Sequence, residues 1–184
     1  MGGNGMLADG WPGIEQGVDS FEAMFQNNKA IMSASCSQWG LPNNSEDEIN
    51  IIKDAIHQVE TSSGVDAHFI LSIVMQESKR CVRVQTTDSG VINPGMMQSH
   101  EGSGSCNKDG SIQNPCPQSE IHQMIMAGVE GFPAGPGLKA LIAQMVVQQM
   151  WFHSTRPPVL TIPALLPQVA TWVSQSPFGL EQWP

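Results

Sequence analysis

The sequence lacks long apolar runs and has few basic residues, and these absences argue against several classes of protein. No stretch of about eighteen apolar residues occurs, so no transmembrane helix and no membrane partner are predicted. Lysine and arginine together number 8, against 17 aspartates and glutamates. A protein that binds nucleic acid through its phosphates needs clustered basic side chains. We therefore expect no nucleic-acid partner for this acidic chain.

The spacings that are typical of protein metal sites are also missing. The chain has no Cys-x-x-Cys pair, so the spacing of its four cysteines argues against a zinc site. Four of the five histidines show no ligand spacing and are interpreted as surface or packing residues: His57, His68, His122 and His153. No metal site is predicted.

The ends of the chain differ in composition from its middle. Residues 1–14 are rich in glycine and are expected to be a flexible segment, and residues 153–184 form an atypical proline-rich tail. The N-terminus has neither a basic region nor an apolar core of a secretion signal, so none is predicted in the sequence as written. Of the 184 residues, 40% are hydrophobic, which is enough for one domain with a core over residues 15–152.

The cysteines are even in number, which favours disulfide bonds. Four cysteines allow three pairings. We favour Cys106–Cys116, which would close a short polar loop, and Cys36–Cys81, which would tie an early segment to the end of a central helix. The alternative is four reduced thiols in a cytosolic protein.

Apolar periodicity and capping residues predict a mainly α fold with at most a small β-hairpin. Asp19 or Ser20 can cap the first helix, and Ser45 with Glu48 forms a capping box for the second. The expected buried positions of the first helix are Phe21, Met24, Phe25 and Ile31. The predicted helical ranges are 20–33, 45 to about 62, 66–79, 117–128 and 138–152, followed by a short helix at 165–173.

The long segment 80–116 is rich in threonine, serine, glycine, asparagine and aspartate. Connections of this length are usually functional. Val82, Val84 and Val91, with the turn residues 86–90 between them, predict a small β-hairpin. The segment follows directly on the third predicted helix, so its residues can face the end of that helix.

The third helix is apolar on nearly all sides and is predicted to be central and buried, with Glu77 at its end. Ile70, Ile73 and Val74 lie seven, four and three positions before Glu77 and share its face. Apolar surroundings and the negative end of the helix dipole both disfavour an ionised carboxylate. We expect a raised pKa for Glu77, which is the property that a general acid needs.

The motif around Glu77 resembles a known family. The stretch from Gly64 to Glu77-Ser78, then Cys81-Val-Arg-Val, Asn93-Pro-Gly-Met-Met-Gln98-Ser-His100 and Cys106-Asn, is similar to a fungal secreted lysozyme-like family. That family is related to the soluble lytic transglycosylases and goose-type lysozymes. Its signature is a Glu-Ser at a helix end, followed after a loop by Gly-Leu-Met-Gln, and Met96 stands here in place of the leucine.

The resemblance implies an α-rich lysozyme-like domain with Glu77 projecting into a cleft. Such enzymes cleave β-linked glycans of N-acetylated amino sugars, above all peptidoglycan, without a cofactor. By this analogy Glu77 is the general acid, and the residues expected to contact the polysaccharide are Asn93, Gln98, Ser99 and His100. The alternative for Gln98 is that its amide satisfies backbone groups in the loop, and His100 has the same alternative. The family and the cysteines imply an extracellular monomer.

The identity of a second catalytic group stays open. Most glycosidases use two carboxylates, and the candidates here are Asp88 and, second, Glu101. A loop aspartate more often caps a turn. Lytic transglycosylases need only one glutamate, which acts as acid and then as base, so both mechanisms remain.

The chain departs from the family after about Gln144. It contains no tyrosine, whereas the family completes its cleft with a tyrosine-rich stretch. Two alternative functions are therefore kept beside the enzymatic one. One is a glycan-binding protein that keeps the fold without the chemistry, and the other is a glycosidase that acts on another glycan, such as chitin or mannan.

Overall fold

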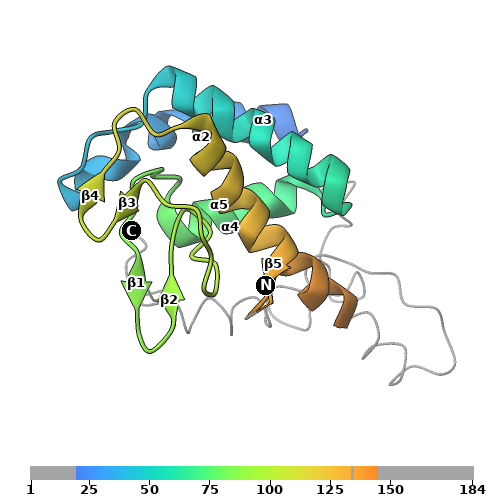
Figure 1. The fold of residues 1–184 in the computed structure, drawn as a ribbon. Coiled ribbons are helices and arrows are strands. Elements are labelled where there is room, and N and C mark those ends of the chain that lie inside the picture. Colours follow the sequence, from blue (N-terminus) through green and yellow to red (C-terminus); the bar gives the residue numbers. More distant parts are fainter. Residues whose placement is uncertain (1–19, 134, 145–184) are drawn as a thin grey trace, which may run out of the picture.

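The computed structural model describes residues 20–133 and 135–144, which form a mainly α structure with small antiparallel strand pairs (Figure 1). Helix α3 packs most extensively against α5, and α2, α4 and α5 complete the helical core. The helices are α2 (Phe21–Ala34), the 3-10 helix η2 (Ser35–Trp39), α3 (Glu46–Ser63), α4 (Ala67–Ser78) and α5 (Gln118–Glu130). Residues 138–144 are helical as well. The predicted fold class is therefore confirmed.

The predicted helix starts are confirmed by their capping bonds. The Ser20 hydroxyl accepts a hydrogen bond from the Ala23 amide, and the Asp66 carboxylate accepts bonds from the first turn of α4. Ser45 and Glu48 form the reciprocal capping box at the start of α3. Pro117 precedes α5 without a side-chain cap.

The prediction that Ile31 belongs to the buried face of α2 is wrong. Ile31 is 49% exposed, whereas Met32 is fully buried together with Phe21 and Phe25. The reason is helix geometry: position 32 lies eleven residues after position 21, close to three whole turns, and so returns to the same face. Met24 lies at the edge of the core.

Helices α3, α4 and α5 supply most of the core. Buried isoleucines and valines of α3 and α4 pack in one cluster with Ile121, Ile125 and Val129 of α5. Helix α4 carries the highest share of apolar residues of these helices and is buried along most of its length, as predicted. Its last residues lead directly into the loops that carry the small strands.

Three strand pairs of two residues per strand lie beside or after these helices. They are β1 (Thr87–Asp88) with β2 (Ile92–Asn93), β3 (Asn107–Lys108) with β4 (Ser111–Ile112), and β5 (Gly131–Phe132) with β6 (Gly135–Pro136), all antiparallel. In Figure 1 the first two hairpins lie together at one side of the helices, and β5 follows the far end of α5.

The predicted hairpin exists, but its strands begin later than expected. Val82 and Val84 are buried side chains before β1, with exposures of 0% and 1%, and Val91 lies in the turn region before β2. These two valines pack in the interior, because burial of their side chains contributes more than a place in a two-stranded ladder at the surface.

Both favoured disulfides are present. Cys36–Cys81 joins η2 to the segment after α4, across 45 residues, and Cys106–Cys116 closes the loop that holds β3 and β4, across 10 residues. The described part of the chain contains no free cysteine. The second disulfide fixes the base of the β3–β4 hairpin.

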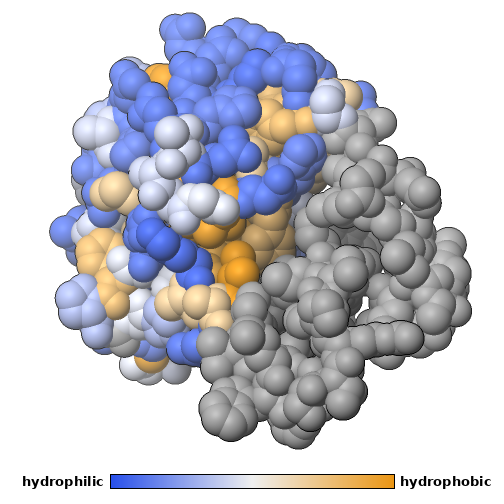
Figure 2. All heavy atoms as spheres, turned by 90° about the vertical axis from the view of Figure 1, so that its right-hand side faces the viewer, coloured by the Kyte–Doolittle hydropathy of each residue, from blue (hydrophilic) through white to orange (hydrophobic). Residues whose placement is uncertain are grey.

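Several predictions fall outside the described residues: the flexible segment 1–14, the second half of helix 138–152, the short helix 165–173 and the tail 153–184. Within residues 20–133 and 135–144, no helix has the length and apolarity needed to span a bilayer. On the face shown in Figure 2, apolar residues form a band within a mostly hydrophilic surface.

Candidate functional site

Glu77 lies in the last turn of α4, and its side chain is buried, with 3% exposure. Ile70, Ile73 and Val74 on the same face are 0–3% exposed. The helix ends at Ser78, and the following residue, Lys79, takes a left-handed conformation while its amide donates to the Met75 carbonyl. The sequence therefore places a carboxyl group at the border between the apolar core and the loop segment. An apolar border of this kind disfavours the charged form.

The Met-Gln element predicted to face Glu77 is a buried turn packed on α5. Met96 and Met97 are fully buried in the same cluster as Val74. Gly95 has φ +73°, and a Cβ there would lie 2.6 Å from Met124 Cγ and 2.7 Å from the Gly104 oxygen, so no other residue fits. Helix α4 and this turn therefore pack into the same hydrophobic core.

Gln98 holds the loops together through its side-chain amide. Its oxygen accepts a hydrogen bond from the Thr87 hydroxyl at 2.7 Å, and its nitrogen donates to the Gly95 and Gln85 carbonyls at 3.0 and 3.3 Å. The side chain is 4% exposed. The backbone-satisfying role considered for Gln98 is therefore observed, and its contact with substrate stays a prediction.

The other predicted contact residues surround this turn. Asn93 pairs with Thr87 in the β1–β2 ladder, and its side-chain amide donates to the Val91 carbonyl. Ser99 is 4% exposed, and its hydroxyl has no partner within the described residues. His100 is half-buried and packs on the backbone at Gly135, which lies in the third hairpin.

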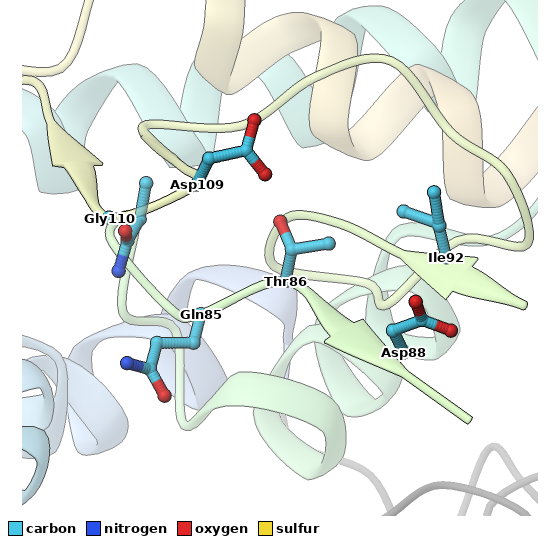
Figure 3. A pocket seen from close by; sticks show the side chains of 7 residues that line it. Gln85, Thr86, Asp88, Ile92, Asp109 and Gly110 are labelled. Atoms are coloured by element: carbon cyan, nitrogen blue, oxygen red, sulfur yellow. The ribbon is translucent and has the colours of Figure 1, made fainter. Parts of the chain in front are cut away.

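A pocket of about 320 Å³ lies between the first two hairpins (Figure 3). Asp88 lines it, and so do Gln85, Thr86, Ile92, Asn107, Asp109 and Gly110. The Asp88 carboxylate accepts a bond from the Gly90 amide at 3.0 Å, so it also caps the hairpin turn. Glu77 is not one of the lining residues of this pocket. The second carboxylate candidate, Glu101, is exposed, and its amide bonds to the Ile92 carbonyl.

The sequence prediction missed Asp109, although a signal for it exists. Asp109 and Gly110 form the two-residue turn between β3 and β4, with φ values of +53° and +80°. An Asp-Gly pair at such a turn is the strongest short-range indication of a hairpin. This hairpin brings Asp109 across from Asp88, with Thr86 between them in the view of Figure 3.

A buried ion pair between Glu48 and Arg83 was also missed. The two side chains are 2% and 0% exposed and lie 35 residues apart in the sequence. The guanidinium donates to the Gln113 carbonyl and the Asn114 side chain, at 2.9 and 2.8 Å. The pair therefore joins the start of α3, the segment after α4 and the disulfide loop.

The Glu48 carboxylate is also satisfied by backbone amides. Cys116 donates to one oxygen and Ser45 to the other, both at 2.7 Å. Burial alone would raise the pKa of Glu48, but these two backbone bonds and Arg83 outweigh it, so its pKa is lowered from the ordinary value. Glu48 is therefore an ionised structural group.

Arg80 is a second fully buried arginine with a different environment. Its guanidinium donates to the side chain and carbonyl of Asn28, at 3.1 and 3.5 Å, and its Nε has no partner within the described residues. Burial lowers the pKa of Arg80 to about 9, so the side chain stays charged at neutral pH.

No group of three or more histidine, cysteine, aspartate or glutamate side chains suited to a metal ion occurs in the part of the chain that the structure describes. His57 and His68 contact the ring of Phe21 edge-on and bond to Glu60 and Asp66, respectively, which makes them packing residues. His122 is half-buried on α5, and His153 lies outside the described residues.

Comparison of the chain with models of known protein families, with curated proteins and with solved structures finds no match in any of the three. The interpretation of the site therefore depends on the residues themselves and on their arrangement.

Proposed function

We propose that this protein is a glycosidase or lytic transglycosylase that cleaves β-linked N-acetylated glycans, peptidoglycan above all, with Glu77 as general acid. The observation that carries the proposal is the burial of Glu77 at the end of α4, on the core that also holds the Met96–Gln98 turn. A carboxyl group kept from bulk water retains its proton more readily, and proton donation to the glycosidic oxygen requires this.

Secretion belongs to the same proposal. Two disulfides persist in oxidising compartments and are rare in the cytosol. An extracellular enzyme would meet peptidoglycan or chitin-like polysaccharide directly, and the proposed chemistry needs no cofactor.

The substitution Glu77→Gln tests the catalytic role. We expect release of soluble fragments from purified bacterial cell walls by the unchanged protein, and a loss of at least about a hundredfold in Glu77→Gln, which is the low end of what a general acid contributes. Glu46→Gln is the matched control, because Glu46 is an exposed glutamate at the start of α3. Cleavage that persists in Glu77→Gln would reject the role.

The products decide between the two mechanisms. Mass spectrometry of the fragments separates reducing ends, formed by hydrolysis, from anhydro ends, formed by transglycosylation. If Asp88 is the second carboxylate, Asp88→Asn should abolish hydrolysis, and if one glutamate suffices, Asp88→Asn should keep the cleavage.

A glycan-binding protein without chemistry is the second candidate. It is favoured by one observation, namely that Glu77 does not line the pocket that Asp88 lines. Saturable binding of chitooligosaccharides with no fragment release over days would support this candidate. Cleavage of chitin or mannan would instead indicate a glycosidase with another substrate.

A further inference from the structure

One motif that the proposed function does not use is the triplet Asn43-Asn44-Ser45, an Asn-x-Ser sequence whose middle residue is not proline. Such a triplet is the acceptor sequence for N-linked glycans in secreted proteins. It occurs once among the 184 residues, since no other asparagine has serine or threonine two positions later. The motif therefore identifies one candidate modification site.

The structure places the acceptor residue of this triplet at the surface. Asn43 is exposed and lies in the loop between η2 and α3. Its side-chain oxygen accepts a hydrogen bond from the Ser37 amide at 2.9 Å. Its side-chain nitrogen donates no hydrogen bond within the described residues, so the atom that would carry the sugar is available.

The neighbouring asparagine shows that the register of the triplet matters. Asn44 is 6% exposed, and its side-chain nitrogen donates to the carbonyls of Arg80 and Met32 at 2.7 and 3.0 Å. A sugar on this nitrogen would have to break both bonds and enter the core. Of the two adjacent asparagines, the triplet therefore selects as acceptor the one that the fold leaves accessible.

The local structure does not depend on the nitrogen that would be modified. Ser45, the third residue of the triplet, accepts the Glu48 amide at 3.2 Å in the capping box of α3. Neither this bond nor the bond from Ser37 to the Asn43 oxygen uses the Asn43 nitrogen. A glycan at Asn43 therefore leaves the contacts of the loop and the helix cap in place.

The disulfides indicate a compartment in which this modification can occur. Disulfide bonds form and persist in oxidising environments, which include the lumen of the endoplasmic reticulum. The Cys36–Cys81 bond spans 45 residues, and the triplet lies within that span. The same route of secretion would thus provide both the disulfides and the glycan.

We propose that Asn43 carries an N-linked glycan, added in the endoplasmic reticulum. The Asn43 nitrogen loses one proton to the solvent and forms a bond to the anomeric carbon of an oligosaccharide that is held on a lipid pyrophosphate. The bond between that carbon and the pyrophosphate oxygen breaks, and the lipid pyrophosphate leaves with the electron pair. The inference shares with the proposed function only the route of secretion and does not depend on catalysis by Glu77.

The test is translation of the full chain, behind a cleavable secretion leader, in the presence of microsomes from the endoplasmic reticulum. We expect the imported protein to show a single discrete shift in electrophoresis, which an amidase that removes N-linked glycans reverses. This amidase converts the modified asparagine to aspartate. Mass spectrometry of the tryptic peptide 30–53 should therefore locate the change at Asn43 and not at Asn44 or Asn50.

Asn43→Asp is the decisive variant, because it keeps an oxygen for the Ser37 amide and has no nitrogen to modify. It should lose the shift completely while import stays unchanged. Ser45→Thr should keep the shift, since threonine satisfies the triplet and also caps helices. Asn50→Asp is the matched control: Asn50 is an exposed asparagine of α3 outside any such triplet, and its variant should keep the shift.

Import is scored separately, by protection of the chain from added protease. Imported protein without the shift, or a shift that persists in Asn43→Asp, would overturn the inference. A chain that the leader does not carry into the microsomes would overturn it as well, because the modification requires that passage.

Failure of this inference can be told apart from failure of the proposed function. If cell walls are not cleaved but Asn43 is modified, the glycan assignment stands without the enzyme. If cleavage requires Glu77 but the imported protein is unmodified, the enzyme stands and the glycan assignment is wrong.

Discussion

The N-terminal turn of α3 and the C-terminal turn of α4 each bury a glutamate, Glu48 at 2% exposure and Glu77 at 3%. Glu48 lies at the positive end of its helix dipole and receives two backbone amides and the Arg83 guanidinium. Glu77 lies at the negative end of its dipole, beside the isoleucines and valine of its own face. Equal burial therefore does not mean an equal environment: the contacts of Glu48 lower its pKa and favour the ionised form, whereas a raised pKa for Glu77 stays a prediction.

This difference explains why only one of the two glutamates is a candidate for chemistry. A carboxylate that is ionised and fully bonded stabilises a junction between segments but cannot donate a proton. A carboxyl group at a negative helix end can hold a proton at neutral pH and release it to a substrate. The predictions below test this contrast.

The largest effect is expected for Arg83→Met, which leaves the Glu48 carboxylate buried without its cation. The free energy of unfolding should fall by about 3–5 kcal/mol, as measured by urea denaturation. Arg80→Met is the matched control, because Arg80 is equally buried but has no carboxylate partner in the described structure. Its effect should be smaller, about 1–3 kcal/mol, because it loses only the hydrogen bonds to Asn28. Equal losses in the two variants would contradict the structural importance of the ion pair.

Glu48→Gln should cost about 1–3 kcal/mol at neutral pH, because Arg83 loses its charged partner while the amide oxygen remains. It should also change the acid response. The lowered pKa of Glu48 means that its stabilisation is present above the unfolded-state pKa of about 4.3 and is lost as pH falls through the folded-state value.

Thermal unfolding followed from neutral pH down to about pH 2 measures this difference. The unchanged protein should lose stability on acidification more steeply than Glu48→Gln does. Parallel curves would show that Glu48 is not the group that titrates.

The smallest effect on stability is expected for Glu77→Gln, within about 1 kcal/mol, since the substitution keeps the size of the side chain and replaces a carboxyl group that we expect to be uncharged. The same variant should lose cleavage of cell walls. A loss of stability as large as that of Glu48→Gln would mean that Glu77 is an ionised structural group, and the contrast between the two helix ends would be wrong.

Local sequence patterns predicted the helices and their starts correctly. Ser20, the Ser45–Glu48 capping box and Asp66 were identified because a cap acts within three residues, and apolar spacing located the buried faces except at Ile31 of α2. The disulfide pairs were also predicted, since the cysteine spacing favoured one long and one short loop. Glu77 was expected at the end of an apolar helix, and it lies there.

The tertiary structure alone decided which polar groups meet. The pairing of Glu48 with Arg83, across 35 residues, leaves no periodic signal, because it depends on how the segments after α4 pack against α3. The same holds for the pocket that Asp88 shares with Asp109, whose two hairpins are brought together only by the fold. Capping and helical burial depend on neighbours within one or two turns, which the sequence displays, whereas the partners of buried or facing charges depend on contacts between segments that are distant in the sequence.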